Sequence, residues 1–310
     1  MSLTKPSSHP ERDMQRKPDW LRVSRRSSPQ QSEVEGLLKE LGLNTVCKEA
    51  NCPNYSDCFS RKTATFMIMG TRCTRNCRFC NVTTASPKPL DSCEPLNVAR
   101  AVAQLGLQYV VITSVTRDDL AATEDKPDAG AVHFAETIRA IKELSPQTAV
   151  EVLIPDFRGD VDALRIIIEA APEVISHNME TVKELYPQVR TGADYQRSLE
   201  LITAIKSLSS EGKDAPQIKS KSGIMLGLGE THEQTLELFD DLLAAGCELL
   251  TIGQYLAPSH EHHPVQAFIE PDVFEHYGEI ARSKGFSFVA SAPLVRSSYQ
   301  AEKALEIPQD

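Results

Sequence analysis

Six of the eight cysteines in this 310-residue chain lie between residues 47 and 80 and form two groups of three. Four and then five residues separate the members of the first group, and three and then two separate those of the second: Cys47, Cys52 and Cys58, then Cys73, Cys77 and Cys80. Thiolates bind soft metals and iron–sulfur clusters tightly. Two such triplets so close together indicate two clusters that face one cavity.

The number of ligands in each triplet favours iron–sulfur clusters over zinc. Structural zinc usually takes four ligands, and neither triplet has a fourth cysteine or a nearby histidine to complete that set. Three cysteines leave the fourth iron of a 4Fe–4S cluster open, which a cluster that binds a substrate requires. Two zinc sites completed by distant residues, or a group of thiols without redox activity, stay open as alternatives.

Three motifs carry a resemblance to a known family. The segment CTRNCRFC, with Phe79 before its last cysteine, matches the CxxxCxxC signature of the radical S-adenosylmethionine (SAM) enzymes. The segment CKEANCPNYSDC resembles the auxiliary-cluster motif of the lipoyl synthase family, and VRSSY at residues 295–299 resembles the C-terminal motif of that family. The resemblance runs from about Trp20 to Ala301 and implies two 4Fe–4S clusters and S-adenosylmethionine as cofactors.

The resemblance also implies residues that bind the cofactor. Loops after the predicted strands carry two pairs of polar residues, Thr113 with Ser114 and Asn178 with Glu180. In the family, the first position receives the methionyl part of S-adenosylmethionine, and the second receives its ribose and methionine parts. Arg190 is a candidate partner for a carboxylate, because a guanidinium pairs with one through two hydrogen bonds. The segment GIMLGLGE resembles the motif that borders the adenine of the cofactor, and it contributes Gly227 and Glu230. Phe79 of the CxxxCxxC segment completes the set of residues that the resemblance implies for cofactor binding.

The C-terminal motif implies a fourth ligand for the auxiliary cluster, Ser298. Ser297 and Ser298 should not both ligate, because neighbouring residues of an extended segment point to opposite sides. An alkoxide is harder and more readily protonated than a thiolate, so we expect this corner to release iron more easily.

The resemblance implies a radical sulfur insertion. One electron would cleave S-adenosylmethionine at the cluster of Cys73, Cys77 and Cys80, and the 5′-deoxyadenosyl radical would remove hydrogen from an octanoyl chain. Sulfur from the auxiliary cluster would then enter at C6 and C8. Implied partners are octanoylated lipoyl domains of 2-oxoacid dehydrogenase E2 and the glycine-cleavage H protein, a ferredoxin or flavodoxin as electron donor, and an iron–sulfur carrier for rebuilding.

Two other classes stay open at this point. A methylthiotransferase also has three cysteines before CxxxCxxC, but those are normally spread over a separate preceding domain, and an RNA-binding domain follows. Only 46 residues precede Cys47 here, which argues against that class. The other alternative is a metal-stabilised scaffold without enzymatic activity.

Composition and charge indicate a soluble enzyme. The chain is 41% hydrophobic and 25% charged, and no apolar run approaches the ~20 residues of a membrane span. Compactly spaced cysteines favour a reducing interior, and acidic residues interrupt the basic ones near the N-terminus, so we expect a cytoplasmic protein. The formal net charge of −10 argues against nucleic acid as a partner. Residues 47–80 carry six basic and two acidic residues, and for most of the basic ones we expect solvated loop positions.

Short apolar runs alternate with helical patterns after the first triplet. This indicates a parallel sheet covered on both faces, as a barrel or as an open sheet. The resemblance favours the barrel over the open sheet. The expected fold class is therefore α/β, a partial (β/α)6 parallel barrel with an N-terminal cluster-binding extension and a C-terminal ligand-bearing tail. The expected strands are Phe66–Met69, Tyr109–Thr113, Ala149–Ile154, Val174–His177, Lys221–Leu226 and Leu249–Ile252, and the expected helices are Ser32–Leu41, Asn97–Leu105, Val132–Glu143, Val161–Ala170, Tyr195–Ser207 and Thr231–Ala245.

The chain is expected to divide into four segments. Residues 1–19 form a flexible tail, 20–62 the extension, 63–290 the partial barrel and 291–310 the C-terminal segment. Trp20, the single tryptophan, is expected to anchor the extension to the body. The histidines of residues 260–263 are expected to lie in a solvated loop rather than to bind a metal.

Overall fold

The computed structural model describes residues 16–23, 28–60, 65–120, 128, 130–210, 216–299 and 301–305. The expected flexible tail lies outside the described residues except for 16–19. Parts of the expected extension (24–27, 61 and 62) and of the expected C-terminal segment (300 and 306–310) lie outside them as well. The division of the chain into four segments stays a prediction.

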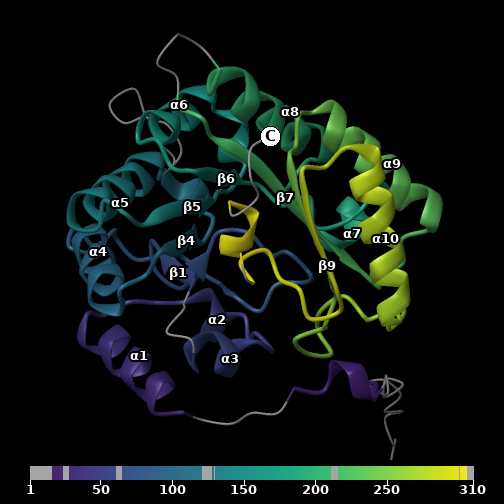
Figure 1. Cartoon of the computed structure of the whole chain (residues 1–310), viewed down its shortest axis with the longest axis horizontal. Coiled ribbons are helices and arrows are strands. Elements are labelled where there is room, and N and C mark those ends of the chain that lie inside the picture. The colour runs from purple at the N-terminus through teal and green to yellow at the C-terminus, as the bar shows by residue number, and fades with distance from the viewer. Residues whose placement is uncertain are drawn as a thin grey trace, which may run out of the picture.

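A parallel sheet of seven strands forms the centre of the fold (Figure 1). The strands follow one another in chain order, and every neighbouring pair is parallel. They are β1 (Thr65–Ile68), β4 (Tyr109–Ser114), β5 (Ala149–Leu153), β6 (Val174–Ser176), β7 (Lys219–Leu226), β8 (Leu249–Gln254) and β9 (Phe288–Ser291). The two edge strands β1 and β9 are not neighbours in the sheet, so the barrel is open.

Helices cover the outer face of the curved sheet, as Figure 1 shows. One long helix stands between each pair of successive strands: α4 (Glu94–Leu105), α5 (Ala131–Leu144), α6 (Val161–Glu169), α8 (Tyr195–Leu208), α9 (His232–Ala244) and α10 (Pro271–Lys284). Because both faces of the sheet are covered, strands such as β1 and β8 are buried at every position. The capping box of Thr231 and Gln234 sets the first turn of α9.

The expected fold class is confirmed, and the barrel itself has one strand and one long helix more than the sequence patterns indicated. All six expected strands and all six expected helices are present within a few residues of their expected bounds. Helix α10 and strand β9 were not expected. The helix has only four buried residues among fourteen, and the strand is four residues long and only partly buried at each position, so neither gives a strong apolar pattern.

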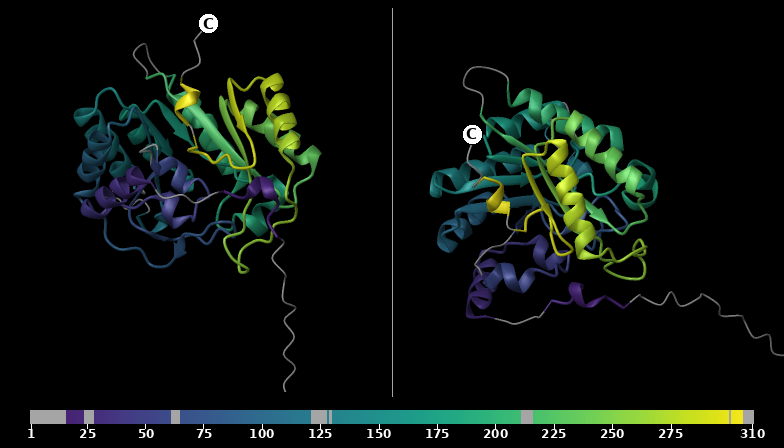
Figure 2. Two further views of the ribbon diagram at one scale, coloured as in Figure 1. Left: turned by 60° about the horizontal axis from the view of Figure 1, so that its bottom comes forward. Right: turned by 45° about the vertical axis from the view of Figure 1, so that its right-hand side comes forward.

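The N-terminal extension contains three helices, α1 (Pro29–Glu40), α2 (Val46–Glu49) and α3 (Tyr55–Ser60) (Figures 1 and 2). Helix α2 packs against β1, and α1 packs against α3 and α4. Met67 of β1 donates its backbone N–H to Asn44 O (2.9 Å), which ties the extension to the sheet. A 3-10 turn, η1 (Asp19–Leu21), precedes these helices. The expectation for Trp20 is wrong: Trp20 is 39% exposed, and its neighbour Leu21, 3% exposed, is the buried residue.

The C-terminal tail crosses the inner side of the barrel and ends in the 3-10 turn η5 (Ala301–Ala304), drawn in yellow in Figure 1. Ala301 packs with Tyr109 and Val111, and Ala304 with Val174 and Leu249. The smaller elements of the fold are β2 (Arg72–Cys73), β3 (Thr83–Thr84), η2 (Asp118–Leu120), η3 (Phe157–Gly159), η4 (Lys183–Leu185) and α7 (Tyr186–Val189). None of the helices within the described ranges has both the length and the apolar character needed to cross a membrane.

Candidate active site

A cavity of about 920 Å³ opens at the carboxyl ends of the strands. Five of the six triplet cysteines line it: Cys47, Cys52, Cys73, Cys77 and Cys80. The sixth, Cys58, lies on α3 and packs against the core beside them. The tertiary structure therefore brings both triplets to one cavity, at the end of a parallel barrel where active sites are found.

The loop of the second triplet is fixed to the barrel by its backbone and by Arg75. The backbone N–H of Arg78 donates to Val189 O (2.8 Å). Arg75 donates through Nε and Nη2 to both carboxylate oxygens of Asp118 (2.8 Å each) and through Nη2 to Asp156 Oδ1 (2.6 Å). Its side chain is only 8% exposed, so Arg75 is not one of the solvated loop residues that we expected most basic residues here to be. These charge-assisted bonds hold the backbone between Cys73 and Cys77 in place.

Burial keeps four of the cavity thiols, Cys47, Cys52, Cys77 and Cys80, protonated in the metal-free chain. Desolvation raises the pKa of Cys47 and of Cys77 to about 11 and that of Cys80 to about 12, and it also raises the pKa of Cys52. Since a metal ligand must be a thiolate, loading of these sites releases protons.

The ends of β4 and the segment after β6 carry the polar residues expected at the cofactor. Thr113 and Ser114 end β4 and line the cavity; Thr113 Oγ1 donates to Leu153 O (3.0 Å). Within the described part of the chain, the buried Ser114 Oγ has no hydrogen-bond partner, which leaves it available to a bound molecule. Asn178 Nδ2 donates to Glu180 Oε1 (3.1 Å), and burial raises the pKa of that carboxyl.

Arg190 enters the cavity from a network of neutral groups. Its Nη1 donates to Tyr186 Oη (2.8 Å) and Ser198 Oγ (3.0 Å), and its Nη2 to His177 Nε2 (3.2 Å). Burial, with Arg190 nearby, lowers the pKa of His177 to about 3, and its Nδ1 donates to Ile154 O (2.8 Å), so Nε2 is free to accept. The sequence analysis missed His177 and Ser198, because a histidine at a strand end carries no signal of its own.

Gly227 and Glu230 do not line the cavity. The Glu230 carboxylate accepts from the backbone N–H groups of Gly227 (2.6 Å), Leu228 (2.9 Å) and Gly229 (3.1 Å). The motif thus holds the loop that follows β7, while Ile224 and Met225 of that strand face the cavity. Phe79 also lines it and packs with Tyr255 and Leu228.

The two serines of the tail contact opposite sides of the cavity. Ser297 Oγ donates to Asn178 Oδ1 (3.1 Å). Thr65 Oγ1 donates to Ser298 Oγ (2.8 Å), and Thr65 also hydrogen bonds to Cys47. The hydroxyl of Ser298 therefore lies on the side of the first triplet, and that of Ser297 on the side of the cofactor residues.

The loop of residues 259–263 lies over the second triplet. The expectation that its histidines are solvated is wrong for two of the three, His262 and His263. His262 Nε2 lies 3.0 Å from Cys80 O, and its Nδ1 lies 2.8 Å from Ser259 Oγ. His263 Nε2 lies 2.8 Å from Leu228 O. Both rings are part-buried and fixed by backbone carbonyls, which sequence spacing could not indicate.

The cavity brings thiols of both triplets together with polar side chains. Each triplet offers three thiols, which suits iron–sulfur ligation with one open corner. Among the described residues, no group of three or more His, Cys, Asp or Glu side chains is arranged to hold a single metal ion. The buried Ser114 hydroxyl adds a polar group that awaits a partner inside the cavity.

Comparisons with known proteins agree on one family. Residues 67–242 match the Radical SAM superfamily. The chain is 53% identical to the lipoyl synthase of Alkaliphilus metalliredigens over 95% of its own length and 97% of the relative's. It is 51% identical to those of Geobacter sp. (strain M21; 94% and 96%) and Bacteroides fragilis (strain YCH46; 93% and 95%).

Solved structures agree on the fold. Methylornithine synthase (PylB) superposes with a TM-score of 0.51 at 15% identity, covering 90% of this chain and 88% of that one. SuiB of Streptococcus suis bound to S-adenosylmethionine gives 0.52 at 12% identity, covering 76% and 53%. At such low identity these likenesses show the shared fold alone.

Proposed function

The chain belongs to the lipoyl synthase family of the radical SAM superfamily, and on that premise we propose which residues hold its cofactors and substrate. It is a radical SAM sulfurtransferase, and its superfamily uses a 4Fe–4S cluster and S-adenosylmethionine. The curated relatives named above are lipoyl synthases at 51–53% identity, which favours this family over the methylthiotransferases.

Cys73, Cys77 and Cys80 would hold the cluster that binds S-adenosylmethionine. They carry the superfamily signature and lie within the matched region. Arg75 holds the loop between the first two by its ion pairs, and His262 holds the carbonyl of the third. When bound, this cluster and the cofactor supply a 5′-deoxyadenosyl radical, and the second cluster supplies the sulfur for C6 and C8 of an octanoyl-lysine.

The cofactor would bind between the second triplet and the ends of β4 to β7. Ser114 offers an unpartnered hydroxyl, and Asn178 and Glu180 offer polar groups from the adjacent segment. Arg190, already oriented by three neutral partners, supplies a guanidinium for the methionyl carboxylate. Thr113 and Phe79 complete the wall, and Gly227 and Glu230 act indirectly by shaping the loop after β7.

Cys47, Cys52 and Cys58 would hold the auxiliary cluster, with Ser298 as the fourth ligand. The observation that carries the proposal is that five of the six triplet cysteines line one cavity, with Cys58 packed beside them, so that a radical formed at one side could reach a chain held next to the other. Ser298 supports this assignment, because its hydroxyl shares Thr65 with Cys47 although 251 positions separate the two residues in the chain (298 − 47 = 251).

The substrate would be an octanoylated lysine on a lipoyl domain of 2-oxoacid dehydrogenase E2 or on the glycine-cleavage H protein. A ferredoxin or flavodoxin would deliver electrons, and an iron–sulfur carrier would rebuild the auxiliary cluster. We propose that this takes place in the cytoplasm.

The test uses anaerobically reconstituted protein with dithionite, S-adenosylmethionine and an octanoyl-lysine peptide, followed by mass spectrometry. The wild type should add two sulfurs to the peptide. Cys52→Ala and Ser298→Ala should form 5′-deoxyadenosine while sulfur insertion falls by about tenfold or more. Ser297→Ala, which loses the contact with Asn178, should lower both products together. Formation of 5′-deoxyadenosine with an untouched peptide would refute the substrate, and a chain that binds only zinc would refute the enzyme.

A further inference from the structure

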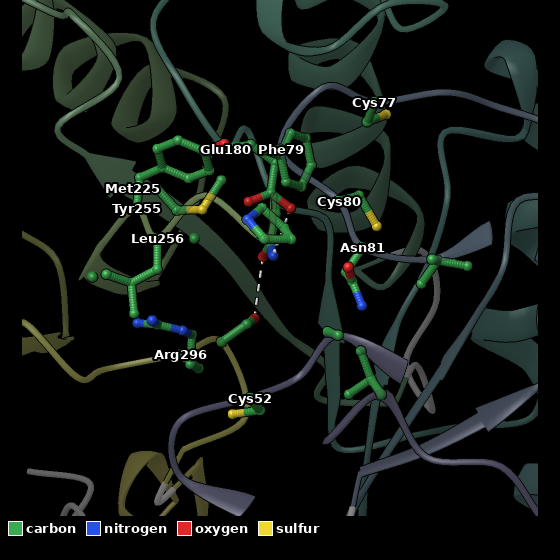
Figure 3. Close-up of a pocket in the computed structure, with 18 of the residues that line it drawn as sticks. Cys52, Cys77, Phe79, Cys80, Asn81, Glu180, Met225, Tyr255, Leu256 and Arg296 are labelled. Carbon is green, nitrogen blue, oxygen red and sulfur yellow. Dashed lines mark hydrogen bonds between the residues drawn. The ribbon is translucent and has the colours of Figure 1, made fainter. Parts of the chain in front are cut away.

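Arg296 is a cation in the cavity wall that has no acidic partner among the described residues. It lines the cavity directly before the two serines of the tail. Its Nη1 donates to two backbone carbonyls, Val295 O (2.6 Å) and Pro293 O (3.4 Å), and no Asp or Glu in the described ranges lies within ion-pair distance of it. Figure 3 shows Arg296 and Cys52 on the same side of the cavity.

The other buried arginines of the cavity have assigned partners. Arg75 pairs with Asp118 and Asp156. Arg190 is oriented by neutral groups and lies beside Glu180, whose carboxyl favours its charged form. Arg296 differs from both, because the group next to it is a thiol of the first triplet. A desolvated guanidinium without an anion is costly, so its position indicates that an anion belongs beside it.

Two contacts fix the backbone that carries Arg296. A Cβ on Gly253 of β8 would lie 2.2 Å from Val295 O and 3.3 Å from Arg296 Nη1, so only glycine lets the tail lie this close to the strand. Asn54 Nδ2, between Cys52 and Cys58, donates to Leu294 O (2.7 Å). The loop of the first triplet thus holds the same stretch of tail that presents the guanidinium to it. The charge is placed by the fold and does not depend on a freely rotating surface side chain.

We propose that Arg296 is the counter-ion of the group that the first triplet binds: its guanidinium lies in the cavity wall on the side of Cys52, where it would retain an anionic group. This rests on the proposed assignment of that triplet to the auxiliary cluster. A positive charge near a redox group stabilises the more negative of its two oxidation states, so Arg296 would shift the midpoint potential of the bound group to a more positive value than a neutral side chain would. Charge-assisted hydrogen bonds from Arg296 to the bound group would also slow the loss of iron.

The experiment isolates the first triplet in the full chain. A background carrying Cys73→Ala, Cys77→Ala and Cys80→Ala is loaded anaerobically with iron and sulfide. Arg296→Met and Arg296→Gln remove the charge, Arg296→Lys keeps it, and Arg139→Met removes an exposed arginine from the distant helix α5 as a matched control. The measurements are the iron and sulfide content, the rate of iron release to a chelator, and the midpoint potential from an EPR-monitored titration.

Both neutral variants should release iron about tenfold faster or more, the size expected for a lost charge-assisted hydrogen bond, with a more negative midpoint potential. Arg296→Lys should restore most of the potential, and Arg139→Met should match the background protein. If the neutral variants release iron at the background rate and at the same potential, the role of Arg296 is refuted while the auxiliary cluster stands. If the background protein itself binds no iron and sulfide, the assignment of the first triplet fails instead. The second neutral variant decides the outcome where one of the two does not fold.

Discussion

Residues of the same type in the cavity differ chiefly in the groups that neutralise their charge or accept and donate their hydrogen bonds. Arg75 and Arg296 both line the cavity with the cysteine triplets, yet Arg75 is paired with two carboxylates, whereas the hydrogen bonds of Arg296 to described residues go to backbone carbonyls. Ser297 and Ser298 are chemically identical, and their neighbours Asn178 and Thr65 distinguish them. The role of each side chain therefore follows from its partners, and residue type alone does not give it.

His177 gives the folded chain a dependence on pH that can be measured. Its pKa is about 3 in the fold against 6.5 as the ordinary value, because burial disfavours the imidazolium. The stability that this group contributes is present above pH 6.5 and is lost as the pH falls toward about 3, since the unfolded chain then binds a proton that the folded chain refuses. We expect the free energy of unfolding to fall by up to about 1.4 kcal/mol per pH unit from this residue.

Urea unfolding of the metal-free chain between about pH 7 and pH 5 measures this slope. His177→Gln keeps a polar side chain without the titration, so its slope should be shallower than that of the wild type. Equal slopes would show that His177 is not the residue responsible. Asp156 does not contribute to the slope in this pH range, because its carboxyl is ionised there in both the folded and the unfolded chain. Its pKa in the fold lies below the ordinary 3.8, since burial opposes the lowering but Arg75 outweighs burial.

Among the elements, the loop after β7 helps to position the site without lining the cavity. Gly227 has a φ of 94°, and a Cβ there would lie 2.3 Å from Ala267 O and 2.4 Å from Gln254 Nε2. Close packing at this point lets residues 265–268 cover the end of the strand. The loop is thus held by glycine geometry and by the Glu230 carboxylate together.

Gly227→Ala should lower the free energy of unfolding by about 1–3 kcal/mol, because it combines left-handed strain with a clash against backbone. Gly229→Ala is the matched control, since Gly229 has a φ of 116° but its added Cβ would meet only the flexible Gln266 Cγ at 3.3 Å. The difference between the two variants in a denaturant titration measures the clash. If both lose the same stability, the close approach at Gly227 has no energetic weight.

At the scale of the whole molecule, one cavity gathers ligands from the extension, the barrel and the tail. The first triplet belongs to α2, α3 and the turn between them, the second follows β1, and Ser298 comes from the last residues described. A group bound to the first triplet and Ser298 would therefore join segments that the barrel alone holds only through a few hydrogen bonds.

Removal of iron and sulfide should therefore lower the melting temperature of the full chain by at least about 5 °C, because a ligand well above its dissociation constant stabilises by several kcal/mol. Anaerobic circular dichroism melts of loaded and chelator-stripped protein make the comparison. Cys93→Ser, at an exposed cysteine outside both triplets, should show the same difference as the wild type. Identical melting temperatures with and without iron would contradict this structural role.

The sequence by itself determined the cysteine triplets, the class of fold and the family, because these depend on local spacing and on the repeating pattern of buried strands. It also indicated that Ser297 and Ser298 face opposite ways, since that follows from extended backbone. Only the tertiary structure decided which groups contact Arg75, Arg296 and the loop of residues 259–263. It also decided that Gly227 does not reach the cavity. Each depends on contacts between residues far apart in the chain, such as Arg75 with Asp156 and Asn54 with Leu294, and no local pattern records which distant groups will neutralise a buried charge.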